Sequence, residues 1–97
     1  MTLLEPWYQV SDPALVVELT RELPPGHALY GKNVRVLARR RDRDDVLFEI
    51  CDGSQRLAKV HLTYAKESDP SWPSTQLFSS QAEWIASMRI DNADYGA

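Results

Sequence analysis

Cysteine and histidine are the residue types in this chain that could together form a nucleophile and its base. Cys51 and His61 lie in two strand-like runs, "DVLFEIC" and "LAKVHLTY", on the same face of the predicted sheet. Such a pair needs hydrogen-bond reach, about 3 Å. In the register predicted below, Cys51 lies opposite Leu57. His61 lies four residues further along, which at about 3.3 Å per residue is roughly 13 Å. The sequence therefore predicts no Cys–His pair and a solvent-facing His61.

The sequence patterns of metal, phosphate and acyl-transfer sites are absent. One cysteine and two histidines cannot supply the four Cys or His ligands that a structural zinc site uses. The four glycines are scattered, so they form no phosphate loop, and a Gly-x-Ser-x-Gly motif is missing. We therefore expect no catalytic residue, no metal and no cofactor. The sequence argues against an enzyme without deciding the question.

Basic residues give an alternative function. The run "ARRRDRDD", residues 38–45, holds four arginines, but its three aspartates would repel phosphate, so a solvated hairpin end is expected. Arg35, Arg39 and Lys59 form a cleaner group, because strand spacing puts them on one face. They favour weak nucleic-acid or anion binding as the alternative. The net charge of −3 is opposite to the basic balance typical of nucleic-acid binders, so a nucleic-acid partner is not expected.

The first helix is predicted within "SDPALVVELTRELPPG". Asp12 or Ser11 can cap its start, Pro13 suits a first turn, and the Pro-Pro-Gly sequence ends it. Apolar residues recur at helical spacing: Leu15, Val16, Leu19 and Leu23. Three charged residues are predicted to face away from the core: Glu18, Arg21 and Glu22.

The second helix is predicted within "FSSQAEWIASMRI". Ser80 and Glu83 have the spacing of a capping box. Its apolar side consists of Trp84, Ile85 and Met88. Residues 91–97 show no periodicity and are predicted to be a frayed tail.

Three strand-like runs lie between the helices: "NVRVLARR", "DVLFEIC" and "LAKVHLTY". Their short polar links predict an antiparallel meander. Pairing Phe48 with Val60 and with Ala38 makes one face continuously apolar and sets Glu49 opposite Lys59. That face consists of Val36, Ala38, Val46, Phe48, Ile50, Ala58, Val60 and Leu62. The predicted fold is α+β, in the order helix, three-stranded meander, helix, with both helices on the apolar face in two layers.

The other face of this predicted sheet is the candidate binding surface. It mixes leucines with charged residues and is left open to solvent. The residues assigned to this interface are Arg35, Leu37, Arg39, Leu47, Glu49, Leu57, Lys59 and His61. A contiguous exposed apolar patch usually marks an interface. Because the charges of this face can reciprocate across a two-fold axis, a second copy of the chain is the simplest partner.

Trp72 is the candidate loop contact. Its loop, residues 65–76, is long for a compact domain, and long loops are often functional. Pro70 and Pro73 stiffen the loop and argue against a mobile lid. Two readings remain open, a plug that closes the edge of the core and a ligand contact.

The length of 97 residues predicts one domain, residues 1–97. No run approaches the roughly 18 apolar residues of a membrane helix, and the start lacks the features of a signal peptide. With a single cysteine, Cys51, an internal disulfide cannot form. The predicted setting is the cytoplasm, without a membrane partner.

A pattern of residues runs through the second half of the chain, from about Val46 to Trp84. It consists of Val60-His61-Leu62-Thr63-Tyr64, Trp72-Pro73, Thr75, Phe78, Ser80 and Glu83-Trp84. This pattern resembles that of short uncharacterised bacterial proteins, in which tryptophan often stands at the position of Tyr64. The resemblance implies a compact bacterial α+β domain and implies no catalytic or binding residue.

Taken together, the sequence predicts a non-enzymatic domain that binds a partner protein or forms a homodimer through the open sheet face. Weak nucleic-acid or anion binding through Arg35, Arg39 and Lys59 is the alternative.

Overall fold

The computed structural model of the protein describes residues 1–96 and contains two helices and five strands. In chain order they are β1 (Trp7–Gln9), α1 (Ala14–Glu22), β2 (Val34–Arg40), β3 (Asp45–Ile50), β4 (Leu57–His61), β5 (Thr75–Phe78) and α2 (Gln81–Tyr95). The strands form one antiparallel sheet in sequence order, with β1 and β5 at its edges. The predicted three-stranded meander is therefore wrong. Its strands are the centre of a five-stranded sheet.

Helix α2 begins where its capping residues predict, whereas the N-cap of α1 is Pro13, one residue after the predicted Asp12. At α1, the Asp12 carboxylate accepts from the Ala14 N–H at 3.0 Å. At α2, the Ser80 hydroxyl accepts from the Glu83 N–H at 3.2 Å, and the Glu83 carboxylate accepts from the Ser79 N–H at 2.6 Å. α2 continues to Tyr95, so the frayed tail predicted from residue 91 is helical through this point. Within residues 1–96, neither helix is long and apolar enough to cross a membrane.

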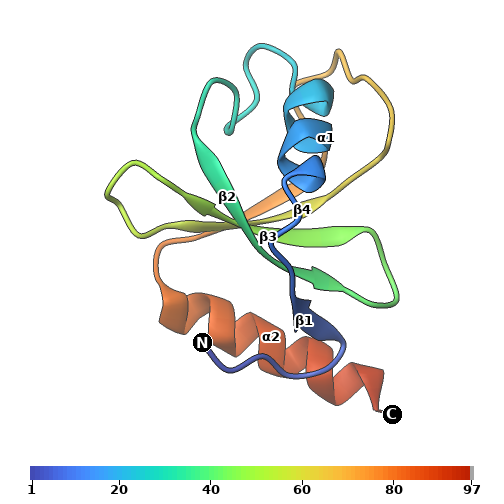
Figure 1. Cartoon of the computed structure of the whole chain (residues 1–97), viewed down its shortest axis with the longest axis vertical. Coiled ribbons are helices and arrows are strands. Elements are labelled where there is room, and N and C mark those ends of the chain that lie inside the picture. The colour runs from blue at the N-terminus through green and yellow to red at the C-terminus, as the bar shows by residue number, and fades with distance from the viewer. Residues whose placement is uncertain (97) are drawn as a thin grey trace.

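The two helices pack on opposite faces of the sheet, which makes three layers (Figure 1). On the α1 side the buried residues are Leu15, Leu19, Leu29, Val36, Val46, Phe48, Ile50, Ala58, Val60 and Leu62. On the α2 side they are Trp7, Ala38, Leu47, Leu57, Phe78, Trp84 and Met88. The prediction that both helices share one face is wrong, because both faces of β3 and β4 carry core residues.

The strand register is shifted by two residues from the prediction. Phe48 lies opposite Ala58, and Val46 lies opposite Val60. Because side chains alternate with a period of two, this shift keeps every residue of β3 and β4 on its predicted face. It also moves Glu49 opposite Leu57 instead of Lys59, and Arg35 becomes its partner at 2.9 Å.

A β-bulge in β2 changes the face of the following residues. The register of β2 against β3 shifts between Val36 and Ala38. Val36 packs on the α1 side, whereas Ala38 joins the core on the α2 side. Ala38 was predicted to lie on the same face as Val36. The extra residue of the bulge, Leu37, accounts for this change.

Glu22 fixes the end of α1 to the segment that follows β4. Its side chain was predicted to face away from the core but is fully buried. The carboxylate accepts from the Thr63 N–H at 2.8 Å, the Thr63 hydroxyl at 3.0 Å and the Tyr64 N–H at 3.0 Å. Burial raises the pKa of the Glu22 carboxyl above its ordinary value, against the opposing effect of these donors. α1 is therefore held by a polar contact as well as by its leucines.

Candidate functional site

Helix α2 covers the centre of the sheet face that was predicted to be open. Leu47 and Leu57 are buried beneath it, together with Trp84 and Met88. The prediction of a continuous interface on this face is therefore wrong, because the domain's own helix occupies the face. The uncovered parts form two hollows, one at each end of the face.

The first hollow has a volume of about 530 Å³. Of the predicted interface residues it contains Arg35, Leu37, Glu49 and Leu57. The Arg35 guanidinium and the Glu49 carboxylate, 2.9 Å apart, neutralise each other at its wall. Met1, Leu3 and Gln81 close the opposite side. This hollow therefore carries no charge in excess and little that selects a ligand.

The second hollow, called the His61 hollow below, has a volume of about 400 Å³ and is lined by Arg43, Asp45, Lys59, His61, Trp72, Ser74, Thr75 and Gln76. Three neighbouring strands supply its floor. Asp45 of β3 lies opposite His61 of β4, and Lys59 of β4 lies opposite Gln76 of β5. The hollow thus joins two predicted interface residues to Trp72, which the sequence could place only as a loop residue.

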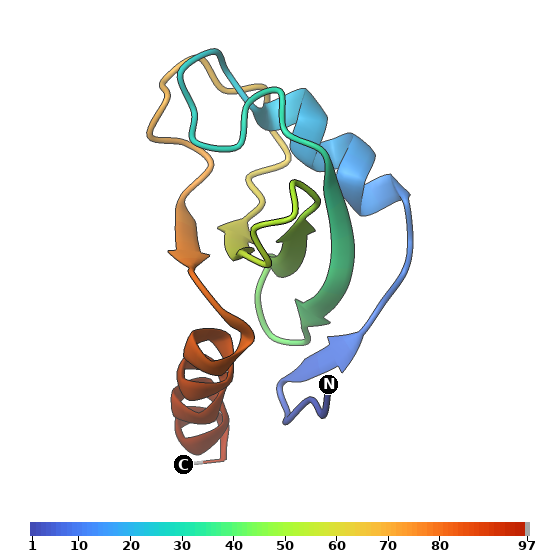
Figure 2. The ribbon, with the colours of Figure 1, turned by 90° about the vertical axis from the view of Figure 1, so that its left-hand side faces the viewer.

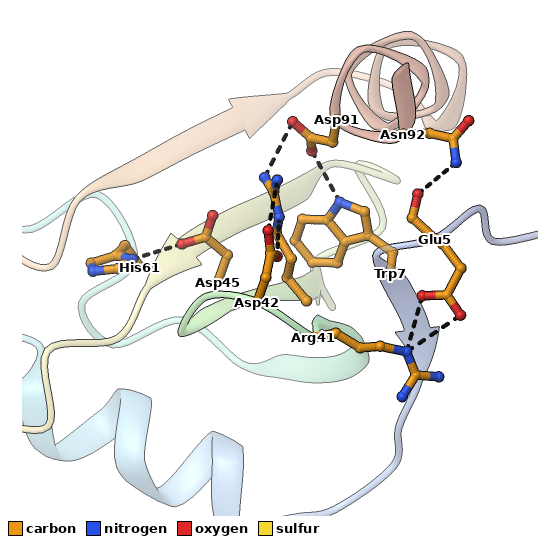
Figure 3. A network of polar contacts seen from close by, with 9 residues as sticks. Glu5, Trp7, Arg41, Asp42, Asp45, His61, Asp91 and Asn92 are labelled. Atoms are coloured by element: carbon orange, nitrogen blue, oxygen red, sulfur yellow. Dashed lines mark hydrogen bonds and ion pairs between the residues drawn. The ribbon is translucent and has the colours of Figure 1, made fainter. Parts of the chain in front are cut away.

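Asp45 orients the His61 imidazole. The Nδ1 atom of His61 lies 2.7 Å from the Asp45 carboxylate (Figure 3). The Asp45 side chain is nearly buried, while half of the His61 side chain is exposed. Within residues 1–96, the Nε2 atom of His61 has no hydrogen-bond partner. A carboxylate that fixes one ring nitrogen leaves the other to contact a ligand in a set direction.

Asp45 of β3, His61 of β4 and Ser74, the residue before β5, lie next to one another, in the manner of an Asp–His–Ser constellation. Asp45 pairs with His61 along the sheet, and the His61 N–H donates to the Ser74 carbonyl at 2.9 Å. However, no hydrogen bond joins the His61 ring to the Ser74 hydroxyl in the described part of the chain. A nucleophilic hydroxyl needs such a bond to its base, and this row does not make it.

Cys51 lies far from this row along the sheet. It follows Ile50 at one end of β3, whereas His61 faces Asp45 at the other end of that strand. Among residues 1–96, no three His, Cys, Asp or Glu side chains gather as they would around a metal ion.

The three basic residues of the alternative function are not brought together. Arg35 is paired in the first hollow. Arg39 lies opposite Val46 on the α1 side, because of the β2 bulge, and its guanidinium is 3.9 Å from Asp44. Only Lys59 lines the His61 hollow. The prediction that these three residues form one cationic patch is therefore wrong.

Trp72 lines the His61 hollow, and its neighbours in the chain are fixed by hydrogen bonds. The side chain is 47% exposed, so it does not plug the core. Before Trp72 in the chain, the Asp69 carboxylate accepts hydrogen bonds from the N–H and the hydroxyl of Ser71, at 2.9 and 2.7 Å. These bonds lower the pKa of Asp69. After Trp72 in the chain, the Pro73 carbonyl accepts a hydrogen bond from Nε2 of the buried His27, at 2.9 Å.

His27 is a structural residue that the sequence did not single out. Its Nδ1 atom accepts from the Leu29 N–H at 3.0 Å, so the proton resides on Nε2. The ring therefore joins the segment after α1 to the segment before β5. His27 and Pro73 are 46 positions apart in the chain, so no local sequence pattern predicts their contact.

A second polar network fixes α2 beside the His61 hollow (Figure 3). The Asp91 carboxylate accepts from the Trp7 indole N–H at 3.0 Å and lies 3.4 Å from the guanidinium of the buried Arg40. The Asn92 amide donates to the Glu5 carbonyl at 2.6 Å. Asp91 continues the helical spacing of Trp84 and Met88, which is the signal that could have revealed it.

β5 is an edge strand with one side unpaired. It pairs with β4 on one side only, and no ribbon lies beyond it (Figure 2). The His61 N–H donates to the Ser74 carbonyl. Because bonding alternates along an antiparallel pair, the backbone groups of Thr75 and Leu77 point away from β4. Gln76 and Leu77 are exposed on the two faces of this edge.

Comparison with known proteins identifies no relative of this chain. No family model matches it, and neither a curated protein nor a solved structure is significantly similar. The resemblance to short bacterial proteins therefore stays a prediction.

Proposed function

We propose that the protein is a non-enzymatic interaction domain that binds an extended segment of a partner protein along the edge of β5. The observation that carries this proposal is the unpaired edge itself. Exposed edges template the addition of another strand, and folded proteins usually blunt them with charges, proline or bulges. The strand Thr75–Phe78 contains no charged residue and no proline. This is the strand-addition mode of peptide recognition.

Two features beside β5 support the proposal. Trp72 is a large, half-exposed aromatic residue, and hydrogen bonds of Ser71 and Pro73 fix the backbone on both sides of it, so little backbone entropy is lost when a ligand covers it. The His61 hollow offers a recess for alternate side chains of an added strand, which is how strand addition gains specificity. Leu77, 44% exposed, offers an apolar contact on the opposite face.

The other edge of the sheet is less suited to this role. β1 follows Pro6, which lacks an N–H group. The Arg41 guanidinium lies 2.9 Å from the Glu5 carboxylate and 4.6 Å from the Tyr8 ring centre beside this edge. Charge and proline at an edge discourage pairing.

The proposed setting remains the cytoplasm, where the single exposed Cys51 would stay reduced. The partner remains a protein in this proposal, as the sequence predicted, but the contact moves from the sheet face to the sheet edge.

Selection of binders from a library of randomised peptides tests the proposal. Peptides selected on the protein should protect the amide protons of Thr75 and Leu77 from solvent exchange in NMR spectra. Leu77→Pro removes an outward N–H without touching the β4 pairing, and it should weaken binding at least about tenfold. Gln9→Pro, the corresponding change on the β1 edge, should leave binding unchanged.

Equal binding to Leu77→Pro and wild type would contradict strand addition at β5, and so would a failure to select any peptide. Protection of Thr75 and Leu77 that grows with protein concentration in the absence of peptide would assign the edge to a second copy of the chain instead of a partner protein.

A further inference from the structure

We propose that the His61 hollow is an anion subsite that receives an aspartate or glutamate side chain of the segment bound at β5. The inference rests on the proposed function for the position of the ligand. It adds the chemistry of the partner, an acidic residue at the position beside Gln76.

The charges of the hollow carry this inference. The hollow is lined by two cations, Lys59 and Arg43, and by one carboxylate, that of Asp45. The Asp45 carboxylate is already bonded to His61. Across the described chain, neither Lys59 nor Arg43 takes part in an ion pair. The arginines of β2 differ, because each has a carboxylate partner: Arg35 with Glu49, Arg39 with Asp44, and Arg40 with Asp42 and Asp91.

The sheet geometry places a ligand side chain within reach of Lys59. Lys59 lies opposite Gln76 on β5, and an added strand would lie one further strand spacing outward. Two spacings amount to about 10 Å between backbones. The four-carbon stem of lysine and the side chain of an acidic residue approach each other across this distance, over Gln76. Carboxylates on the same face of the added strand are thus the groups that Lys59 can meet.

The walls of the hollow strengthen such a contact. Trp72 stands at the rim, and Asp45 holds His61 in one orientation. Partial exclusion of water by these side chains lowers the local dielectric constant, which strengthens an ion pair relative to one in bulk water.

A single acidic side chain fits this site better than a nucleic acid does. The protein carries a net charge of −3, which repels a polyanion at long range. Asp42 and Asp44 flank Arg43 in the chain and would meet the phosphates on either side of a bound one. One carboxylate on an extended peptide avoids both penalties.

A double-mutant cycle tests the inference on a peptide that protects Thr75 and Leu77. Replacing its acidic residue by the corresponding amide should weaken binding to wild type about fivefold, the size of a partly exposed ion pair. With Lys59→Gln the same replacement should change binding less than about twofold. Lys32→Gln, which removes an equal charge from an exposed turn, should behave as wild type.

Titration of the ¹⁵N-labelled protein with acetate, inorganic phosphate and single-stranded DNA provides the second measurement. Acetate should shift the signals of Lys59 and His61, and Lys59→Gln should abolish these shifts. If acetate binds there but no peptide protects Thr75 and Leu77, the proposed function fails and the anion subsite stands. If peptides bind at β5 but the cycle shows no coupling to Lys59, the subsite is overturned. Saturation by DNA in preference to acidic peptides would overturn the choice of partner.

Discussion

At the scale of single residues, the most informative position is a carboxylate inside the fold. Glu22 is buried and, among residues 1–96, forms no ion pair; it accepts hydrogen bonds from the backbone N–H groups of Thr63 and Tyr64 and from the Thr63 hydroxyl. Burial raises its pKa, and its hydrogen bond with Glu18 acts in the same direction. This carboxyl connects α1 to the start of the segment between β4 and β5, which carries Trp72. Its protonation therefore bears on the stability of the fold around the candidate site.

We predict that Glu22→Gln destabilises the protein, and more at pH 4 than at pH 7. The amide group leaves one backbone N–H facing another donor, which costs about 1–3 kcal/mol. Because the folded-state pKa of Glu22 lies above its unfolded value of about 4.3, the wild-type carboxyl contributes most below that value. The contribution declines as pH rises through the folded-state pKa. Urea unfolding at both pH values measures the difference.

Glu83→Gln is the control of opposite sign. Hydrogen bonds from Ser79 lower the pKa of Glu83. Its carboxylate therefore contributes stability above the unfolded pKa and loses it as pH falls, so this variant should cost more at pH 7 than at pH 4. A penalty for Glu22→Gln that grows from pH 4 to pH 7 would show that the Glu22 pKa is not raised.

At the scale of elements, α2 determines where the candidate site lies. Trp84 packs edge-on against Trp7, with ring centres 4.8 Å apart, and against Phe78 at 5.7 Å. Asp91 then ties the far end of the helix to Trp7 and Arg40. These contacts hold α2 across the middle of the sheet face. The hollows on either side of it follow from this position.

We predict that Trp84→Ala costs about 3–5 kcal/mol of unfolding free energy, because the fully buried indole leaves a large cavity. Guanidinium unfolding followed by circular dichroism measures this loss. Ile90→Ala, on the exposed side of the same helix, should change stability by less than about 0.5 kcal/mol. A loss below about 1 kcal/mol for Trp84→Ala would mean that α2 is peripheral to the core.

At the scale of the whole molecule, the three-layer arrangement decides which surfaces are free. α1 and α2 cover the two faces, so the edges of the sheet and the ends of the α2 face remain accessible (Figures 1 and 2). Under the proposed function, a partner would bind along β5 without opening the core.

We predict that Leu47→Lys unfolds the protein, because this side chain lies at the centre between the sheet and α2. Burying an unpaired ammonium there should cost more than about 4 kcal/mol. Leu77→Lys, at the exposed edge, should leave the free energy of unfolding within about 0.5 kcal/mol of wild type. Thermal melts of the two variants compare them directly. If Leu47→Lys folds, this face of the sheet is open to solvent, as the two-layer prediction assumed.

The sequence by itself determined the features that rest on local periodicity. Alternation identified β2, β3 and β4 and the inward face of Val46, Phe48 and Val60, because a face survives a register shift of two residues. The spacing of Ser80 and Glu83 located the start of α2, because a capping box is made within one helical turn.

Only the tertiary structure decided the layers, the edges and the candidate site. The leucines at positions 47 and 57 alternate with charged residues, a pattern that fits a solvated face as well as a core covered by a distant helix. β1 and β5 have three and four residues, too few for a period to show, and their pairing is long-range. The His61 hollow combines residues of three strands and two loops. Their proximity depends on the register and on the position of α2, which no segment encodes alone.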